Sequence, residues 1–426
     1  MRSPRTRLCL ISVIVAALVL TFTHTDPSTA RAQHTSNASS GRYIVTFDDS
    51  SAANAYAYVL SFSREVRIDH QYASALDGFA GRIPASIAAA LRNDPAVKAV
   101  EPDVAVSVNV EELPTGIDRI DAEPPGDIDA IGPDLDIDIA VIDTGIDLDH
   151  PDLRVAGGFA SYGVAEILFL RLCGLTDSFD DGNGHGTHVS GTAAARDNSI
   201  GVAGVAPGAR LWAVRVLGPA GTGCLSDVIA GVDWVTDHAS TIEVANMSLG
   251  SSSSSPTLCS AIASSVAAGV TYAVATGNDG ANAANTSPAN CADVIATSAI
   301  ADYDGAPGGG AESTCTDGGA DDTFATFSNF GAVVDVAAPG VCIFSTYMGG
   351  GYDTLSGTSM ASPHTAGAVA RFIVQTGYGG SAAPSTVLGA MNAAGWLESQ
   401  SGACGFTGDP DASHEPLIHP GATCAP

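Results

Sequence analysis

From about residue 130 onward, short apolar runs alternate with segments of helical periodicity, and this alternation restricts the fold more than any other feature. Five runs indicate buried strands: residues 137–142, 211–217, 244–249, 270–275 and 294–299. Helical patterns lie between them at residues 185–195, 227–236 and 260–268. The pattern predicts an α/β fold, a doubly wound parallel sheet with helices on both faces. Such sheets bind ligands beyond the carboxyl ends of their strands, so a functional site is expected there.

The segment at residues 41–109 has a different rhythm, with short strands and short helices. Its strand and helix patterns are, in order, residues 43–47, 52–61, 79–83, 86–91 and 97–100. This predicts a small α+β domain that precedes the larger domain, which we place at residues 110–400. A last helix is expected at residues 384–399. Residues 401–426 are expected to form a C-terminal tail, because they have no clear periodicity.

Residues 1–32 match an export signal. Three arginines precede an apolar run from Leu8 to about Phe22, and Ala30-Arg31-Ala32 is a small-residue cleavage site. A retained membrane anchor is the alternative, and the short apolar run and the cleavage site favour removal. No later stretch is long and apolar enough to cross a bilayer. We therefore expect a soluble protein that is secreted to an extracellular location.

The charge of the chain is strongly negative, −29 at pH 7, and it is unevenly distributed. Residues 1–110 hold 10 of the 17 basic residues but only 9 of the 46 acidic ones, so the acidity lies in the larger domain. A nucleic-acid partner is excluded by this balance, because no basic face is left to neutralise phosphates. Divalent-cation binding, a salty habitat and simple solubility all fit it.

Nine cysteines are present, and Cys9 would leave with the signal. The remaining even number, in an exported chain, predicts four disulfides. Our proposed pairs are Cys173–Cys224, Cys259–Cys291, Cys315–Cys342 and Cys404–Cys424. No Cys or His spacing typical of a zinc site occurs.

Residues 357–364 read Gly-Thr-Ser-Met-Ala-Ser-Pro-His and place one hydroxyl, Ser359, at the start of an apolar helix. Pro363 is tolerated because the first helical turn has no internal N–H bonds to lose. The unpaired N–H groups and the helix dipole at this position favour an oxyanion that forms as Ser359 attacks a carbonyl. The alternative is that Ser359 only caps the helix.

Two further residues supply what a nucleophilic serine needs. Asp143 ends the buried strand pattern at residues 137–142, and His185 begins a helical pattern within Gly-His-Gly-Thr-His. Alone, such an Asp usually begins a turn and such a His is usually structural. Together, a histidine base within reach of Ser359 and a carboxylate that orients it form a catalytic triad in the chain order Asp, His, Ser.

These blocks, with Asn246-Met247-Ser248-Leu249-Gly250 and Ala275-Thr276-Gly277-Asn278, resemble the subtilisin-like serine proteases, the subtilase family. The resemblance covers roughly residues 110–400, and residues 41–109 resemble the inhibitory propeptides of that family. It implies a serine endopeptidase of broad specificity with His185, not His188, as the base. It also implies that Asn278 completes the oxyanion hole beside the Ser359 N–H, where the alternative is a plain Asn-Asp-Gly turn. Ser248, Leu249 and Gly250 would bind the substrate main chain and Gly277 would line the S1 entrance, where the alternative is a plain edge strand.

A structural Ca²⁺ site is implied by the match of residues 196–202 to the calcium loop of the family. Its ligands would be the carboxylate of Asp152, the side chain of Asn198 and the carbonyls of Arg196, Ile200 and Val202, oxygen donors that suit this ion. A surface turn without calcium is the alternative. Residues 156–182, which include Cys173, depart from the family pattern, so substrate preference on that side stays open.

The resemblance also implies that the chain is an autoprocessed zymogen and a monomer. The extended segment at residues 100–109 would lie in the cleft along residues 248–250, and matching Leu113-Pro114-Thr115-Gly116 to the mature amino terminus places the cut after Asn109. Val106 would then occupy an apolar subsite four residues before the cut. Two other classes of protein are alternatives. A catalytically dead binding module conflicts with the complete set of chemical residues, and an α/β-hydrolase esterase would need a G-x-S-x-G motif that is absent.

Overall fold

A computed structural model describes residues 40–63, 65–103, 105–107, 116–120, 122, 133–162, 166–167, 170–171, 178–198, 200–313 and 318–420. The predicted signal at residues 1–32 lies outside them. The chain divides into two compact units: Met1–Gln71 with Asp77–Asp103, and Tyr72–Leu76 with Val104–Pro426. Among the described residues, no helix combines the length and apolarity that a membrane span requires.

The first unit is built on a four-stranded sheet in the order β2-β3-β1-β4. Its elements are β1 (Ser40–Phe47), α2 (Ser50–Leu60), β2 (Arg67–Tyr72), β3 (Asp77–Pro84), α3 (Ala85–Arg92) and β4 (Val97–Pro102). Asp49 caps α2 by accepting from the N–H groups of Ser51 and Ala52. The elements expected from the sequence are all present. β2 was not predicted, because most of its side chains are partly exposed and it lacks an apolar alternation.

The second unit contains the predicted parallel sheet, whose central strands run in the order β16-β14-β13-β12-β6-β10-β7 and are all parallel. Their bounds are β6 (Asp138–Asp143), β7 (Val155–Ala160), β10 (Arg210–Arg215), β12 (Val244–Met247), β13 (Thr271–Ala275), β14 (Ile295–Ala301) and β16 (Val336–Pro339). Every residue of β6, β12, β13, β14 and β16 is buried. Burial on both faces explains why these strands read as continuous apolar runs.

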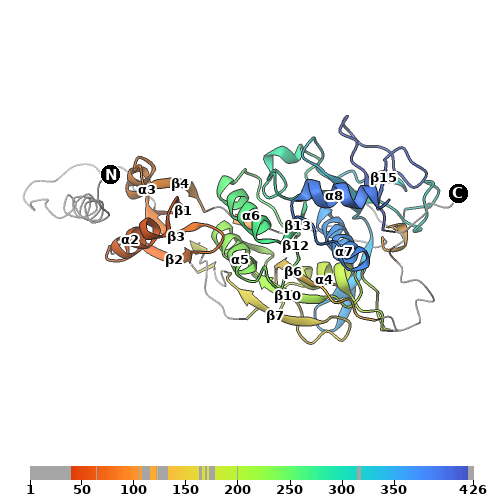
Figure 1. Cartoon of the computed structure of the whole chain (residues 1–426), viewed down its shortest axis with the longest axis horizontal. Helices are drawn as coiled ribbons and strands as arrows, with labels where there is room; N and C mark the ends of the chain where they lie inside the picture. The colour runs from red at the N-terminus through yellow and green to blue at the C-terminus, as the bar shows by residue number, and fades with distance from the viewer. Residues whose placement is uncertain are drawn as a thin grey trace, which may run out of the picture. The chain divides into compact units, whose positions relative to one another are not determined.

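Helices cover the sheet in two pairs (Figure 1). The first pair is α4 (His185–Ala194) and α7 (Thr358–Thr376), and the second is α5 (Leu225–Asp237) and α6 (Pro256–Ala268). The first pair packs closely because Gly367 of α7 has no side chain. A Cβ at this position would lie 2.8 Å from the carbonyl oxygen of Ala193 in α4. The predicted doubly wound α/β fold with a preceding α+β unit is thus confirmed.

The C-terminal end of the chain joins the sheet, which the sequence did not indicate. α8 (Pro384–Ala393) ends before Gly395, whose φ of +78° is left-handed, so the helix predicted to reach residue 399 is six residues shorter. β19 (Leu397–Glu398) then pairs antiparallel with β20 (Leu417–Ile418), and β20 runs parallel to β16. β15 (Thr323–Phe324) pairs antiparallel with β14. Part of the predicted tail therefore belongs to the main fold.

Short elements and disulfides complete the described residues. β5 (Ala105–Ser107) pairs antiparallel with β11 (Thr222–Cys224), β17 (Ile343–Tyr347) pairs with β18 (Gly351–Leu355), and β8 (Glu166–Ile167) pairs with β9 (Leu170–Arg171). Two 3₁₀ helices span Asp118–Ile120 and Ala283–Asn285. The Cys259–Cys291 disulfide is confirmed. Cys224, Cys342 and Cys404 are also disulfide-bonded, but Cys173, Cys315 and Cys424 lie outside the described residues, so those three pairings stay predictions.

Candidate active site

Asp143 and His185 meet where β6 ends and α4 begins. His185 Nδ1 lies 2.8 Å from Asp143 Oδ1, and the same carboxylate oxygen accepts from the N–H of Thr144 at 2.7 Å. Asp143 is fully buried and His185 is 1% exposed. Gly184 precedes the helix with a φ of +103°, a left-handed conformation that favours glycine. The acid at a strand end and the histidine at a helix start thus lie together, as the sequence predicted.

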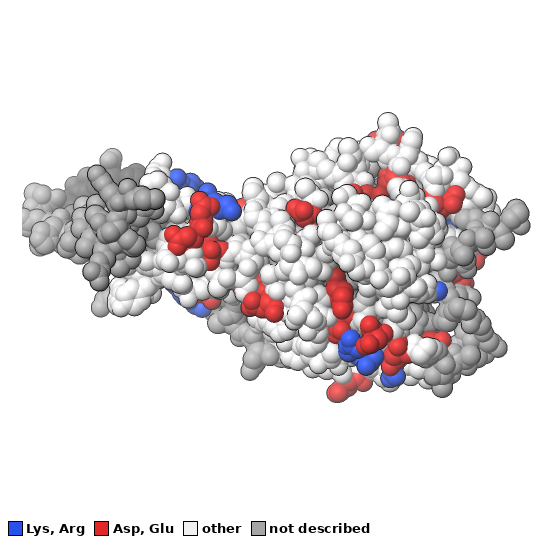
Figure 2. All heavy atoms as spheres, in the orientation of Figure 1, with Lys and Arg blue, Asp and Glu red and all other residues white. Residues whose placement is uncertain are grey.

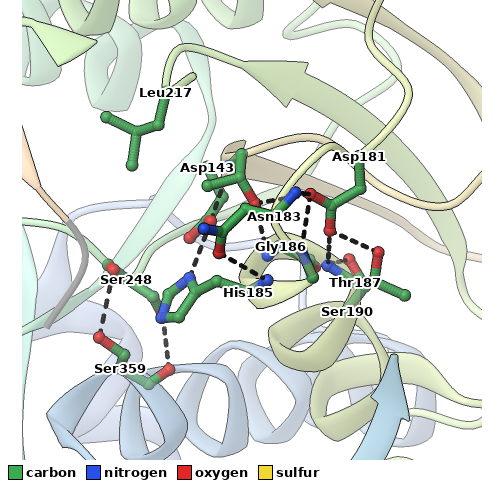
Figure 3. A network of polar contacts seen from close by, with 12 residues as sticks. Asp143, Asp181, Asn183, His185, Gly186, Thr187, Ser190, Leu217, Ser248 and Ser359 are labelled. Atoms are coloured by element: carbon green, nitrogen blue, oxygen red, sulfur yellow. Dashed lines mark hydrogen bonds and ion pairs between the residues drawn. The ribbon is translucent and has the colours of Figure 1, made fainter. Parts of the chain in front are cut away.

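Ser359 is the second residue of α7 and is 1% exposed. Pro363 was expected in the first turn but is the sixth residue, inside the helix, so it removes the N–H that would bond the carbonyl of Ser359. The hydroxyl of Ser359 donates to the carbonyl of Ser248 at 3.2 Å, and the hydroxyl of Ser248 donates back to the carbonyl of Ser359 at 2.6 Å. The imidazole of His185 lies between Asp143 and Ser359, with Nδ1 on the side of the acid (Figure 3). The three predicted residues therefore converge from three separate elements.

Asn278 follows β13 and faces the start of α7. Its Oδ1 accepts from both the N–H and the hydroxyl of Thr358, at 2.9 Å each. The hydroxyl of Thr358 in turn accepts from the N–H of Gly277 at 3.0 Å. Because the amide oxygen is held by Thr358, the NH₂ group is the end of this side chain that is available to donate. This geometry suits stabilisation of a developing negative charge.

The other two histidines near the helix starts have different surroundings. His188 is fully buried, its Nε2 lies 2.9 Å from the carbonyl of Ile343, and burial lowers its pKa to about 3. His364 is also fully buried, with Nδ1 2.8 Å from the carbonyl of Met360, and burial lowers its pKa to about 4. Both rings are therefore neutral at ordinary pH, and neither contacts Asp143. These contacts favour His185 over His188 as the base.

Asp181 organises the start of α4 and was not singled out from the sequence. One of its carboxylate oxygens accepts from the N–H groups of Asn183 (2.9 Å) and Gly184 (3.0 Å) and from the hydroxyl of Thr144 (2.9 Å). The other accepts from the N–H (2.9 Å) and hydroxyl (2.6 Å) of Thr187 (Figure 3). A carboxylate at a helix N-terminus satisfies unpaired N–H groups and the helix dipole.

The sequence signal for Asp181 was weak, because Asp-Asp-Gly-Asn is an ordinary turn composition. Its partner Thr144 also accepts from the N–H of Gly186 at 2.9 Å. Thr144 follows Asp143, and Gly186 follows His185. Asp181 and Thr144 therefore connect the segments that hold the two members of the pair.

The predicted substrate-binding residues lie beside this site, but in a different local structure. β12 ends at Met247, so Ser248 and Leu249 lie after the strand that was expected to reach residue 249. An added Cβ at Gly250 would lie 3.4 Å from the methyl group of Thr286, and one at Gly277 would lie 3.7 Å from the same methyl. Gly250 and Gly277 therefore share Thr286 as a neighbour, a residue that no sequence pattern indicated.

β11 is a second candidate for substrate contact, because the extended segment β5 pairs with it. β5 runs antiparallel to it, with Ala105 opposite Cys224 and Ser107 opposite Thr222. An extended chain in this arrangement is bound by main-chain hydrogen bonds. The segment at residues 100–109 was expected along residues 248–250, but its described strand, residues 105–107, pairs with residues 222–224 instead. Residues 104, 108 and 109 lie outside the described residues.

The predicted calcium residues come together around Asp152, which is fully buried. Its carboxylate accepts from Asn198 Nδ2 (3.0 Å), from the N–H of Val202 (3.0 Å) and from the hydroxyl of Tyr352 (3.2 Å). The carbonyl of Asp152 accepts from the N–H of Arg196 at 2.9 Å. Burial raises the pKa of the Asp152 carboxyl. Asp152 and Asn198 are thus adjacent, but Arg196 and Val202 contact Asp152 through their N–H groups, and the Asn198 amide must turn to present its oxygen. The Ca²⁺ site stays a prediction.

Elsewhere in the described residues, carboxylate oxygens of Asp302, Asp304 and Asp321 lie within 4.8 Å of one another. Asp321 accepts from the N–H groups of Tyr303, Gly310 and Ala311 at 2.8–2.9 Å. These bonds hold a glycine-rich turn. On the face drawn in Figure 2, acidic side chains are scattered and basic ones gather in a few small groups.

Comparisons with known proteins agree with this site. The subtilase family matches residues 135–391, and the peptidase inhibitor I9 family matches residues 42–109. An alkaline protease of Alkalihalobacillus alcalophilus is 38% identical over 340 residues, covering 77% of this chain and 80% of the relative. Subtilisin E of Bacillus subtilis (strain 168) is 34% identical over 377 residues, covering 87% of this chain and 89% of the relative.

A solved structure, that of a cold-adapted subtilisin-like serine proteinase, is similar with a TM-score of 0.55 and 32% sequence identity, covering 72% of this chain and 98% of that one. The family match spans more than half of the chain, and it includes the segments that carry Asp143, His185, Asn278 and Ser359. The chain belongs to the subtilase family: it is a subtilisin-like serine endopeptidase preceded by a propeptide of the inhibitor I9 type.

Proposed function

We propose that Asp143, His185 and Ser359 form the catalytic triad. The observation that carries this is the 2.8 Å contact between Asp143 Oδ1 and His185 Nδ1. If Nδ1–H donates to the carboxylate, the lone pair of Nε2 faces Ser359 and can accept its proton as Oγ attacks the peptide carbonyl. The imidazolium then protonates the leaving amine, and water repeats the sequence to release the acyl group.

The oxyanion formed in both steps would be stabilised by Asn278 Nδ2 and by the N–H of Ser359. Asn278 is oriented for this role by the two hydrogen bonds from Thr358 to its oxygen. Ser359 lies in the first turn of α7, where N–H groups have no acceptor within the helix. Both donors are fixed before the reaction, so little reorganisation is needed as the charge develops.

Substrate would bind as an extended chain along Ser248, Leu249 and Gly250, with its P1 side chain near Gly277. Main-chain recognition of this kind tolerates many side chains, which supports broad specificity toward protein and peptide substrates. Export through the signal at residues 1–32 would place the enzyme outside the cell as a soluble monomer. Ca²⁺ would stabilise the loop around Asp152 without taking part in the chemistry.

Residues 41–109 would act as an intramolecular inhibitor that is cut after Asn109. The pairing of β5 with β11 supports this, because it holds the end of that segment as an extended strand within the second unit. Tyr72–Leu76 belongs to the same unit, where the N–H of Ser74 donates to Asp233 Oδ1 of α5 at 2.8 Å. Tethering raises the effective concentration of the cleavage site, so self-processing would be intramolecular.

The test uses the full chain and its Ser359→Ala variant. The wild type should hydrolyse casein in a reaction blocked by phenylmethylsulfonyl fluoride, and its amino terminus should lie near Val110. The variant should be inactive and accumulate with residues 41–109 attached, while keeping the wild-type circular dichroism spectrum. Ser362→Ala is the matched control, because Ser362 lies on the same helix and bonds Asn246 instead. Wild-type activity in Ser359→Ala would refute the triad, and full activity of an uncut wild type would refute the maturation step.

A further inference from the structure

Asn329 is fully buried in the loop between β15 and β16, and its side chain binds the turn that follows β13. Its Oδ1 accepts from the N–H groups of Asp279 at 3.0 Å and Ala281 at 2.9 Å. Its Nδ2 donates to the carbonyl of Thr276 at 2.9 Å. One buried amide thus contacts the backbone both before and after Asn278, the proposed oxyanion donor.

The main chain of Asn329 adds a fourth contact, since its N–H donates to the carbonyl of Gly277 at 2.8 Å. Gly277 has a φ of +104°, and a Cβ there would lie 2.5 Å from Asn329 Nδ2. The left-handed backbone at residue 277 and the amide at residue 329 therefore fit each other closely. Together they set the direction in which the chain enters Asn278.

Asn329 is itself anchored to the central sheet through its neighbour Ser328. The hydroxyl of Ser328 accepts from the N–H of Ala299 in β14 at 3.0 Å and donates to the carbonyl of Asn329 at 3.2 Å. The contacts therefore run from a buried strand, through Ser328 and Asn329, to the turn that carries Asn278. A rigid supporting shell of this kind determines how accurately a donor is aimed.

We propose that Asn329 is a positioning residue for transition-state stabilisation, acting through Asn278. It does not touch the substrate. It fixes the turn at residues 276–281 so that Asn278 Nδ2 points to the place where the oxyanion forms. This inference rests on the proposed oxyanion role of Asn278. It predicts that loss of Asn329 lowers kcat and leaves substrate binding nearly unchanged, because the ground-state carbonyl needs this donor less than the oxyanion does.

The experiment is a double-mutant cycle on the mature enzyme, with kcat and KM measured on a peptide anilide after active-site titration. Asn278→Ala should lower kcat by about 10²–10³, the magnitude known for loss of such a donor in a subtilisin and taken from there. Asn329→Ala should lower kcat by about 10–100-fold with KM within about twofold, because a small misplacement of a catalytic group is costly. Added to Asn278→Ala, it should change kcat by less than about twofold.

Two further variants keep the test decisive. Asn329→Ser keeps a small neutral hydroxyl that can accept from Asp279 or Ala281, so it should fold if Asn329→Ala does not, and it should lose less kcat. Asn282→Ala is the matched control, an exposed amide in the same segment that bonds the N–H of Ala284, and it should keep wild-type kcat.

A purely structural role would lower the melting temperature and leave the kcat of the folded enzyme unchanged, which would overturn the inference. Losses that multiply fully in the double mutant would overturn it as well, because Asn329 would then act by another route. Wild-type kcat in Asn278→Ala would instead refute the proposed oxyanion role itself, and the inference would fail with it.

Discussion

On the side of β6 and α4, the carboxylate of Asp181 holds the start of the helix that carries His185, whereas on the side of β13 the neutral amide of Asn329 holds the turn that carries Asn278. Both groups bind backbone atoms on either side of the residue they support. They differ in charge. Asp181 brings a negative charge close to the proposed base, and Asn329 brings none to the proposed oxyanion donor.

This difference follows the chemistry expected at each side. When His185 takes a proton it becomes a cation, which a nearby carboxylate stabilises. The oxyanion beside Asn278 is an anion, which a nearby carboxylate would destabilise, and a neutral amide supports the donor without that cost. A supporting residue is therefore constrained by the charge that develops next to it as well as by the hydrogen bonds it must make.

The largest expected effect comes from Asp143, the carboxylate that contacts the proposed base. Asp143→Asn should lower kcat by at least about 10⁴-fold, because an amide at this position can donate to Nδ1 and leave the imidazole in the wrong tautomer. Turnover of a peptide anilide is the measurement, with a melting curve to show that the fold is retained. Asp147→Asn removes the same charge four residues away and should be nearly neutral. Equal losses in the two variants would mean that general charge matters and orientation does not.

The proposed catalytic residues could be predicted from the sequence because they lie at the ends of regular elements, whereas Asp181 and Asn329, which support them, could not. Asp143, His185 and Ser359 each lie at the end of a buried strand or the start of a buried helix, where hydrophobic periodicity marks the boundary. Asp181 and Asn329 lie in loops. Their partners are mostly backbone groups of loops, joined for Asp181 by the hydroxyls of Thr144 and Thr187, and such contacts leave no pattern in the amino-acid order.

β20 and Glu415 illustrate the same limit. The two-residue strand Leu417–Ile418 is too short to show a period, and it is added to the sheet through β16. Glu415, just before it, is 5% exposed and accepts at 2.6 Å from the hydroxyl of Ser298 in β14. The segment has the composition of an exposed tail, but it contains a buried acid whose burial depends on tertiary contacts.

Glu415 and Asp181 differ in how well their carboxylates are hydrogen-bonded. Asp181 accepts from five donors, whereas Glu415 accepts from the hydroxyl of Ser298, and burial raises the pKa of Glu415 to about 7. The folded state then favours the protonated acid, so stability is lost as pH rises from the unfolded value near 4.5 through 7. Glu415→Gln should remove this loss, raising the free energy of unfolding by up to about 3 kcal/mol at pH 8 and by little at pH 4. Urea titrations at the two pH values measure it. Equal shifts at both would exclude ionisation as the cause.

Calcium tests a third carboxylate, Asp152, which lies near the end of α4, whereas Asp181 lies at its start. Binding at a hundredfold excess over Kd would stabilise the folded state by about 2.7 kcal/mol. EDTA should therefore lower the melting temperature, and added Ca²⁺ should restore it. Asp152→Ala should abolish that response, and Asp152→Asn should weaken it while keeping acceptors for Val202 and Tyr352. If EDTA left the wild-type melting curve unchanged, the hydrogen bonds to Asp152 alone would hold this loop.

The smallest expected effect, about tenfold in kcat/KM, concerns Asp181→Asn. The amide oxygen of the variant can still accept from N–H groups, but its NH₂ group would face the N–H and hydroxyl of Thr187 and cannot accept from them. The start of α4 is therefore held less firmly. Removing the charge also removes a carboxylate that stabilises the imidazolium formed when His185 takes the proton, so kcat falls.

Asp180→Asn is the matched control, since this neighbouring acid is exposed and its charge is screened by solvent. It should leave kcat/KM unchanged. An Asp181→Asn enzyme with the wild-type kcat/KM would show that the negative charge of Asp181 makes no contribution. The charge comparison with Asn329 would then fail, because both sides of the site would be supported by hydrogen bonds alone.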